Sequence, residues 1–293
     1  MTIRRTVVCS LAALLLASIG LSSQAEPELA LWAERKYNSW ENPLHSEVTI
    51  NDKLVNIFTS DTMEPLAGAI KPGWNTIQVK TTPQEPAKNG NGLTFRLGPT
   101  RQDPAKKRVV MSPVIWEFRN DSDWKLQDSA FSHPLGPTVK EVILNYRLYY
   151  AGLQHEGAEL KAGDYVLRGQ PKYGSWNSPV VATVSVNGTM LNSFTLAART
   201  IIITPFLKPG RNEIKIISER VPDTIVNNDI EFSVAGPAEW EVSNNRFTVR
   251  PIVQFNAMQG WERDVRSGQL RNPLKAGANT IERVVPFVMK PTP

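Results

Sequence analysis

A repeat with a period of 136 to 138 residues constrains this chain more than any other feature. The segment KYNSWENP at residues 36–43 returns as KYGSWNSP at residues 172–179. The segment KPGWN at residues 71–75 returns as KPGRN at residues 208–212, and Trp124 returns as Trp261. A period of this length is that of a whole domain, too long for a solenoid or propeller unit. We therefore expect two copies of one domain, residues 26–150 and 151–293.

The first 25 residues have the pattern of an export signal. Arg4 and Arg5 precede an apolar run at residues 7–21, and Ser23-Gln24-Ala25 is a small-x-small cleavage site. This run is too short for a spanning helix, and no later stretch approaches ~18 apolar residues, so we expect no membrane-spanning segment. The mature chain is expected to begin at residue 26 and to be periplasmic or secreted.

Removal of the signal changes the charge and the cysteine content. The whole chain has 33 Lys and Arg against 28 Asp and Glu, and loss of Arg4 and Arg5 leaves 31 against 28. A surplus this small does not indicate a nucleic-acid partner. The only cysteine, Cys9, is in the signal, so the mature chain has neither disulfides nor a cysteine nucleophile. The three histidines are far apart in sequence, so we expect no metal and no cofactor.

Each copy has the pattern of short β-strands. Apolar and polar residues alternate at residues 76–80 and 93–97, and again at residues 213–216 and 231–234. Asn51-Asp52 and Asn187-Gly188 are turn signals between such runs. Only residues 28–36 look helical. The pattern predicts an all-β chain of two similar β-sandwich domains in tandem.

The second copy resembles a known fold family. VSVNG at residues 184–188, followed by ITPFLKPGRNEIKI at residues 203–216, is similar to the galactose-binding-like, jelly-roll β-sandwich of carbohydrate-binding modules. The resemblance covers about 35 residues of each copy, and the first copy departs from it with Asn51-Asp52 in place of Asn-Gly. It implies this fold for both copies and a sugar ligand for the family. A fold does not carry its function with it, however.

Paired carboxylates are the one catalytic pattern that the sequence offers. Glycoside cleavage needs two carboxyl groups roughly 5–10 Å apart. The candidate pairs are Asp121 with Asp123, Glu239 with Glu241, and Glu262 with Asp264. Such pairs also occur on any exposed strand or loop, and the acids near Trp124 and Trp261 differ between the copies. We therefore assign no catalytic residues, and a glycan-cleaving enzyme is the third hypothesis.

The aromatic residues divide into those shared by the copies and those that differ. For the shared set we favour core packing over ligand contact; it comprises Tyr37, Tyr173, Trp40, Trp176, Trp124 and Trp261. Residues that differ between copies are better candidates for ligand binding. Trp74 follows a turn glycine where the second copy has Arg211. The predicted ligand-binding residues are Trp74, Asn75, Trp116, Arg211 and Trp240.

Three functions remain, and we favour the first. An exported, non-catalytic binding protein would hold an envelope or secreted protein, as adaptors, inhibitors and immunity proteins do, with Trp, Tyr and Arg at the interface. A carbohydrate-binding protein would use flat aromatic rings with nearby amides, on a cell-wall or extracellular glycan. A duplicated fold without a catalytic domain, and with diverged surface residues, favours the protein partner.

Overall fold

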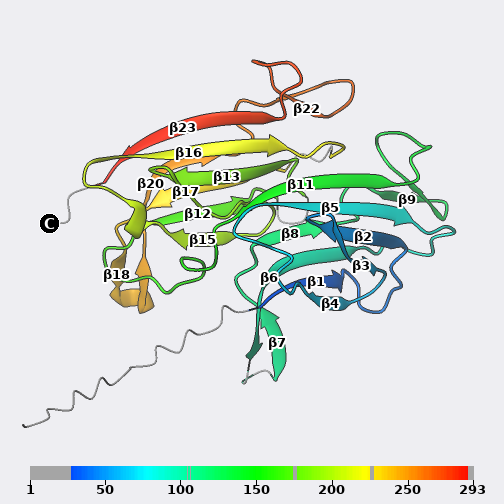
Figure 1. Ribbon diagram of the computed structural model, residues 1–293, viewed down its shortest axis with the longest axis horizontal. Helices are drawn as coiled ribbons and strands as arrows, with labels where there is room; N and C mark the ends of the chain where they lie inside the picture. Colours follow the sequence, from blue (N-terminus) through cyan, green and yellow to red (C-terminus); the bar gives the residue numbers. More distant parts are fainter. Residues whose placement is uncertain (1–27, 104, 106, 174–176, 225–227, 290–293) are drawn as a thin grey trace, which may run out of the picture.

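The computed structural model describes residues 28–103, 105, 107–173, 177–224 and 228–289, which form an all-β structure of antiparallel sheets (Figure 1). The only other regular elements among them are two short 3₁₀ turns, η1 (Thr204–Phe206) and η2 (Val242–Asn244). The predicted export signal lies outside the described residues, as do residues 174–176 of the KYGSW segment in the second copy. The all-β prediction is confirmed.

Two sheets form the first half of the chain, residues 28–150. One has the order β4-β1-β6-β7, with β8 also paired to β6: β1 (Leu29–Arg35), β4 (Thr62–Pro65), β6 (Leu93–Asp103), β7 (Arg108–Met111) and β8 (Trp116–Arg119). The other has the order β11-β5-β2-β3: β2 (Leu44–Ile50), β3 (Lys53–Phe58), β5 (Gly73–Pro83) and β11 (Val142–Tyr150). A small hairpin joins β9 (Lys125–Gln127) and β10 (Ala130–Ser132).

Two further sheets form the second half, residues 151–289. One has the order β15-β12-β17-β20: β12 (Val166–Pro171), β15 (Arg199–Ile202), β17 (Ile230–Ala235) and β20 (Pro251–Asn256). The other has the order β14-β13-β16-β23: β13 (Val180–Val186), β14 (Thr189–Met190), β16 (Arg211–Arg220) and β23 (Thr280–Val288). Two hairpins complete it: β18 (Glu239–Glu241) with β19 (Arg246–Thr248), and β21 (Glu262–Arg263) with β22 (Leu270–Arg271).

The strand order of the first half recurs in the second. The orders β4-β1-β6-β8 and β15-β12-β17-β20 correspond strand by strand, as do β11-β5-β2-β3 and β23-β16-β13-β14. In each half, buried side chains from both sheets belong to one hydrophobic cluster. The sequence repeat is therefore matched by a repeat of strand connectivity and of core.

Paired asparagines fix the same turn in both halves. Asn51 has a positive φ of 48°, and its Nδ2 donates to Asn75 Oδ1 at 2.8 Å. Asn75 in turn binds the backbone N–H and C=O of Lys71 at 2.9 and 2.7 Å. Asn187 and Asn212 repeat this arrangement, with the amide contact at 2.7 Å. Asparagine tolerates the left-handed conformation that these tight turns require, which explains the turn signals of the sequence.

Residues 28–36, which the sequence presents as helical, contain strand β1 instead. Leu31 and Ala33 are buried while Trp32 and Glu34 are only half-buried, so the side chains alternate as in a strand. β1 pairs with β4 on one side and with β6 on the other. The helical expectation is wrong because two neighbouring strands satisfy this backbone, and such tertiary pairing overrides weak local propensity.

The two halves contact each other directly. Ser193 N–H donates to Tyr149 C=O at 2.9 Å, and Tyr149 N–H donates to Ser193 Oγ at 2.8 Å. Val181 and Val221 of the second half join the hydrophobic cluster of the first. β13 is buried along its whole length as a result, whereas its counterpart β2 is buried only at alternate residues.

Across the described residues there is no helix of the length and apolar character needed to cross a bilayer.

Candidate functional site

Exposed aromatic rings gather on the loop that follows β1. Tyr37 is 43% exposed and Trp40 is 46% exposed, and their ring centroids are 4.7 Å apart. Lys36 Nζ lies 5.2 Å from the Tyr37 ring centroid, within range of a cation–π contact. We call residues 36–40 the first aromatic loop. Exposure of two large aromatic rings to water beside a cation is energetically unfavourable unless a binding partner covers them.

A buried asparagine holds the first aromatic loop in shape. Asn91 is fully buried, and its Oδ1 accepts from Tyr37 N–H at 3.0 Å. Its Nδ2 donates to the carbonyl oxygens of Tyr37 at 3.0 Å and Trp40 at 2.9 Å. One side chain therefore satisfies three backbone groups of the loop, so the two rings are presented from a fixed backbone.

The second half repeats this arrangement with Asn228. This asparagine is fully buried; its Oδ1 accepts from Tyr173 N–H at 2.9 Å and its Nδ2 donates to Tyr173 C=O at 2.8 Å. Tyr173 is 51% exposed, with Lys172 Nζ 5.8 Å from its ring centroid. We call residues 172–176 the second aromatic loop, of which 172 and 173 are described. The repeat has kept an exposed Tyr, its Lys and the asparagine that holds them.

The first aromatic loop and Asn177, four residues after Tyr173, contact the same short segment, residues 119–122. Lys36 Nζ lies 3.7 Å from Asp121 Oδ2. Asn177, which follows the second loop, accepts from Arg119 N–H at 2.9 Å and donates to Arg119 C=O at 2.7 Å. Its own N–H donates to Ser122 Oγ at 3.3 Å. The chain on the C-terminal side of the second loop is therefore fixed to the segment that the first loop contacts, and we take the two loops together as the candidate functional site.

The shared aromatics thus have two different roles. Trp124 is buried against Phe131, and Trp261 packs on the core of the second half, as expected for core residues. Tyr37, Trp40 and Tyr173 are exposed, so the expectation of core packing is wrong for them, and Trp176 lies outside the described residues. The neighbouring residues in the sequence indicate this exposure. They are Lys, Asn, Ser, Glu and Pro, with no alternation of apolar residues.

The structure places two of the predicted ligand-binding residues in the interior. Trp116 is fully buried and packs against Phe118 and Tyr146 at centroid distances of 6.0 and 5.5 Å. Asn75 is buried in the turn described above. The expectation that they face a ligand is corrected, because Trp116 fills the core and the amide of Asn75 is engaged by its own turn.

The other three predicted residues are at the surface but on different elements. Trp74, at the start of β5, is partly exposed, with the Arg147 guanidinium 3.9 Å from its ring centroid and Tyr149 at 5.4 Å. Arg211 is exposed at the corresponding turn of the second half. Trp240 is half-exposed on the hairpin of β18 and β19 and packs on Phe247.

Three of the carboxylates in the candidate pairs have individual partners of their own. Asp121 binds Arg119 at 3.2 Å, and Glu262 binds Arg271 at 2.9 Å. Hydrogen bonds from the Ser267 backbone and hydroxyl lower the pKa of Asp264. Within the described part of the chain, no three His, Cys, Asp or Glu side chains are placed to hold a metal ion.

A polar groove of about 300 Å³ lies on the outer face of β12, β17 and β20. Amide and hydroxyl groups line it, with one cation and one acid, from Arg168, Gln170, Glu231, Ser233, Gln254 and Asn256. In the first half the same sheet positions carry an ion-pair network, in which Arg96 binds Glu34 at 2.5 Å and Glu117 at 2.9 Å. In the second half neutral side chains, Gln170, Ser233 and Gln254, replace the three charged ones, and Ser233 is smaller than Arg96.

Comparison of the chain with known proteins found no matching family model, no similar curated protein and no similar solved structure. The aromatic loops and the polar groove are therefore interpreted from their own geometry.

Proposed function

We propose that this chain is an exported, non-catalytic binding protein that recognises a protein partner in the cell envelope or outside the cell. In this proposal residues 1–25 direct export to the periplasm or the medium, and residues 26–150 and 151–293 are two similar β-sandwich domains. The observation that carries the proposal is the exposed tyrosine loop held by a buried asparagine in both halves.

The chemistry of the aromatic loops favours a protein partner. Tyr and Trp are the residues that most often dominate the binding energy of protein interfaces. A loop whose backbone is already fixed loses little conformational entropy on binding, which leaves more of the contact energy for affinity. Lys36 and Lys172 beside the rings add a positive rim that suits an acidic surface on the partner.

The duplication supports the use of both loops on one partner. Because Lys36 of the first loop and Asn177, which follows the second, both contact residues 119–122, we infer that a single partner surface can contact both loops. Binding of the first loop then raises the effective concentration at the second, which increases the overall affinity without any new type of contact.

A pull-down with matched variants tests this proposal. Mature protein, residues 26–293, is incubated with an envelope extract of its own cell, as wild type, as Tyr37→Ala/Trp40→Ala, and as Leu274→Ala. We expect one stoichiometric protein to be retained by the wild type and by Leu274→Ala, which removes an exposed apolar side chain from another loop, and to be lost from the double variant. Equal retention by the double variant would contradict the proposal.

A glycan ligand is the second candidate, and the polar groove of the second half is the observation that favours it. Neutral amides and a hydroxyl on a sheet face suit the hydrogen bonding of sugar hydroxyls. The first half supplies the matched control: the triple variant Gln170→Glu, Ser233→Arg, Gln254→Glu would rebuild its ion-pair network and fill the groove. Retention on one polysaccharide, including peptidoglycan in the panel, and loss in the triple variant would favour this function.

A further inference from the structure

The contact between the two halves joins two different surfaces. The second half contributes residues 177 and 193–195, which we call its head face. The first half contributes the outer edge of β8 and the end of β11, which we call its tail face. Because each half repeats the same strands, the first half also has a head face and the second half also has a tail face. The head-to-tail contact within the chain uses one face of each kind and leaves the other two unused.

Side chains of the head face satisfy the backbone of the tail face. Thr195 Oγ1 accepts from Glu117 N–H at 3.2 Å. Two residues further along the same edge of β8, Asn177 binds both backbone groups of Arg119, as described above. These groups belong to the edge of β8 that faces away from β6, so the head face takes the place of a neighbouring strand.

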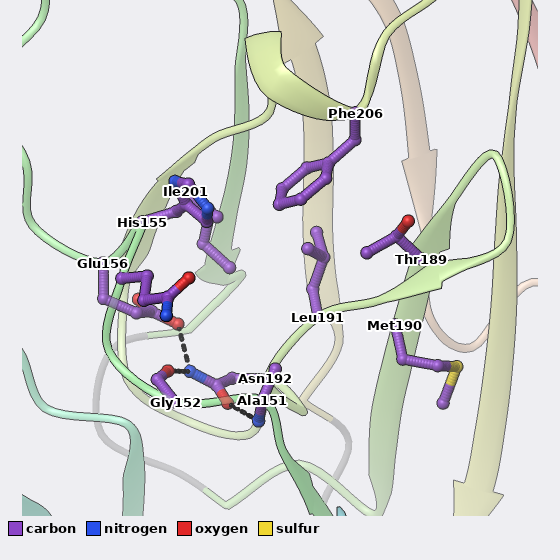
Figure 2. A pocket seen from close by; sticks show the side chains of 11 residues that line it. Ala151, Gly152, His155, Glu156, Thr189, Met190, Leu191, Asn192, Ile201 and Phe206 are labelled. Atoms are coloured by element: carbon purple, nitrogen blue, oxygen red, sulfur yellow. Dashed lines mark hydrogen bonds between the residues drawn. The ribbon is translucent and has the colours of Figure 1, made fainter.

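The contact continues at the end of β11. Tyr149 and Ser193 exchange two hydrogen bonds, as described above. Figure 2 shows Asn192, the residue before Ser193, bonded to Ala151 and Gly152 of the segment that follows β11. The head face is therefore held at two strands of the tail face, one in each large sheet of the first half.

The head face of the first half is exposed. The residues equivalent to 177, 193 and 195 are Glu41, Ile57 and Thr59, each 136 positions earlier. In the second half these three positions are buried, whereas in the first half all three are exposed, Ile57 by 54%. Leu54, 59% exposed on the same strand, extends this apolar surface along the edge strand β3. An uncovered apolar edge strand is a site for pairing with another chain.

The tail face of the second half is also open. Strand register makes Gln254, Asn256 and Val288 the equivalents of residues 117, 119 and 149. Gln254 and Val288 are exposed, Val288 by 61%, and Asn256 is half-buried. A hollow of about 460 Å³ lies where the first half holds Asn177, and it is lined by Asp229, Gln254, Phe255, Asn256, Met258 and Gln259. Figure 1 shows β3 and β20 in opposite parts of the molecule, so one chain cannot join its own two free faces.

The two free faces remain complementary at this hollow. At the position of Asn177 the free head face has Glu41, whose carboxylate supplies the acceptor for Asn256 N–H. A carboxylate cannot donate to the Asn256 carbonyl as the asparagine amide would, but Arg283 of the second half already does so. Asp229, the acid of the hollow, accepts two backbone N–H groups at 2.8 and 2.9 Å. The threonine that binds the backbone of the tail face is the same in both head faces.

We propose that the free head face of one copy binds the free tail face of a second copy of this chain, in the arrangement that joins the two halves. Each added copy again offers one free face of each kind, so the contact builds an open row or a closed ring rather than a symmetric dimer. The free head face has His45 where the second half has Val181, which joins the core of the first half, so we expect association between copies to be weaker than the contact between halves. Tyr173 is 51% exposed although the contact beside it is formed, so the aromatic loops stay accessible and the inference does not depend on the partner proposed for them.

A charged substitution on each free face tests this proposal. Ile57→Arg blocks the head face, Val288→Arg blocks the tail face, and Val242→Arg, on a residue 83% exposed beside β18, is the matched control. Circular dichroism establishes that all three variants are folded. Sedimentation of mature protein, residues 26–293, is measured from about 1 µM to 1 mM, a range that covers weak protein contacts. We expect the average mass of the wild type and of Val242→Arg to rise beyond that of a dimer, and each of the other two variants to stay monomeric.

An equimolar mixture of Ile57→Arg and Val288→Arg separates a head-to-tail contact from a symmetric one. The first variant keeps its tail face and the second keeps its head face, so the mixture should form a 1:1 dimer and nothing larger. The proposal is overturned if the wild type stays monomeric at about 1 mM, if either variant alone associates like the wild type, or if the mixture stays monomeric.

Discussion

Buried asparagine side chains hold the turns and loops of this fold in place, at Asn75, Asn91, Asn212 and Asn228. Each binds both a backbone N–H and a backbone C=O of a neighbouring segment. An asparagine can do this because its amide carries an acceptor and two donors in one plane. Two of them, Asn91 and Asn228, connect the interior of the fold to the loops that form the candidate site.

Replacement of Asn91 by alanine should weaken both the fold and the candidate site. The change leaves three backbone groups of the first aromatic loop without their partner, and we expect the free energy of unfolding to fall by about 2–4 kcal/mol. Urea unfolding of Asn91→Ala measures this. Asn38→Ala, an exposed asparagine of the same loop, should cost less than about 0.5 kcal/mol. Equal costs for the two variants would show that Asn91 does not hold the loop.

His133 should make stability depend on pH. It is buried beside Trp124, and this burial lowers the pKa of its imidazole below the usual 6.5, against the opposing charge of Asp223. Below pH 6.5 the unfolded chain therefore binds a proton that the folded chain does not, and the stabilisation present above that pH is lost as pH falls.

The variant His133→Asn tests this pH dependence. Asparagine can still accept the hydrogen bond that Leu135 N–H donates to His133 Nδ1 at 3.2 Å. We expect the loss of unfolding free energy between pH 7.5 and pH 5.5 to be smaller in His133→Asn than in the wild type. Parallel pH profiles for the two proteins would rule out His133 as a source of the dependence.

The sequence predicts turn residues better than it predicts which aromatic rings are buried. Asn51 and Asn187 were identified from the turn alone, because positive φ is a local requirement. The burial of Trp116 depends on β8 pairing with β6 and on contact with Tyr146, 30 residues further along the chain. The exposure of Tyr37 depends on Asn91, 54 residues away. Such contacts are not encoded in local pattern.

At the scale of elements, β2 and β13 show how one strand of the repeat was adapted to two environments. Both strands bury alternate residues in their own core. The other face of β13 contacts the first half, whose hydrophobic cluster includes Val181. On this face Thr183 Oγ1 lies 2.6 Å from Ser193 Oγ, which in turn accepts from Tyr149 N–H of β11 at 2.8 Å. The other face of β2 is half-exposed and carries Glu47 at the position equivalent to Thr183.

Exchange of these two residues should have unequal effects. Thr183→Glu places a larger, charged side chain at a buried position in contact with Ser193, and we expect it to lower the free energy of unfolding by about 2–4 kcal/mol. The reverse change, Glu47→Thr, lies on a half-exposed face and should cost less than about 0.5 kcal/mol. Chemical denaturation of both variants measures the difference. Similar costs would mean that β13 is not covered by the first half in solution.

The sequence predicts which segments form strands, but it does not predict which strands pair with each other. Alternation identified the segments that contain β5, β6, β16 and β17. It did not identify β1, whose short Leu-Ala-Leu-Trp-Ala run suits a helix as well as a strand. Pairing with β4 and β6, which both come later in the chain, selects the strand over the helix.

At the scale of the whole molecule, the contact between the halves involves hydrogen bonds, buried apolar groups and charge. Asn177 binds the backbone of β8, and Ser193 binds that of β11. Arg147 lies 3.7 Å from Glu219, whose pKa is raised by burial although the arginine opposes this effect. The halves therefore share more than a linker, and we expect them to unfold together even though each has its own core.

Calorimetry of the mature chain tests this expectation. We expect one transition for the wild type, because Val181 and Val221 of the second half complete the core of the first. Val221→Asp would place a carboxylate in that shared cluster and should lower Tm by about 5–10 °C, whereas Val265→Asp, on a residue 98% exposed, should leave Tm within about 1 °C. Two separate wild-type transitions would show instead that the halves are independent domains. In that case the two aromatic loops could move relative to each other, and the flexibility between them would weaken the gain in affinity expected from binding a single partner.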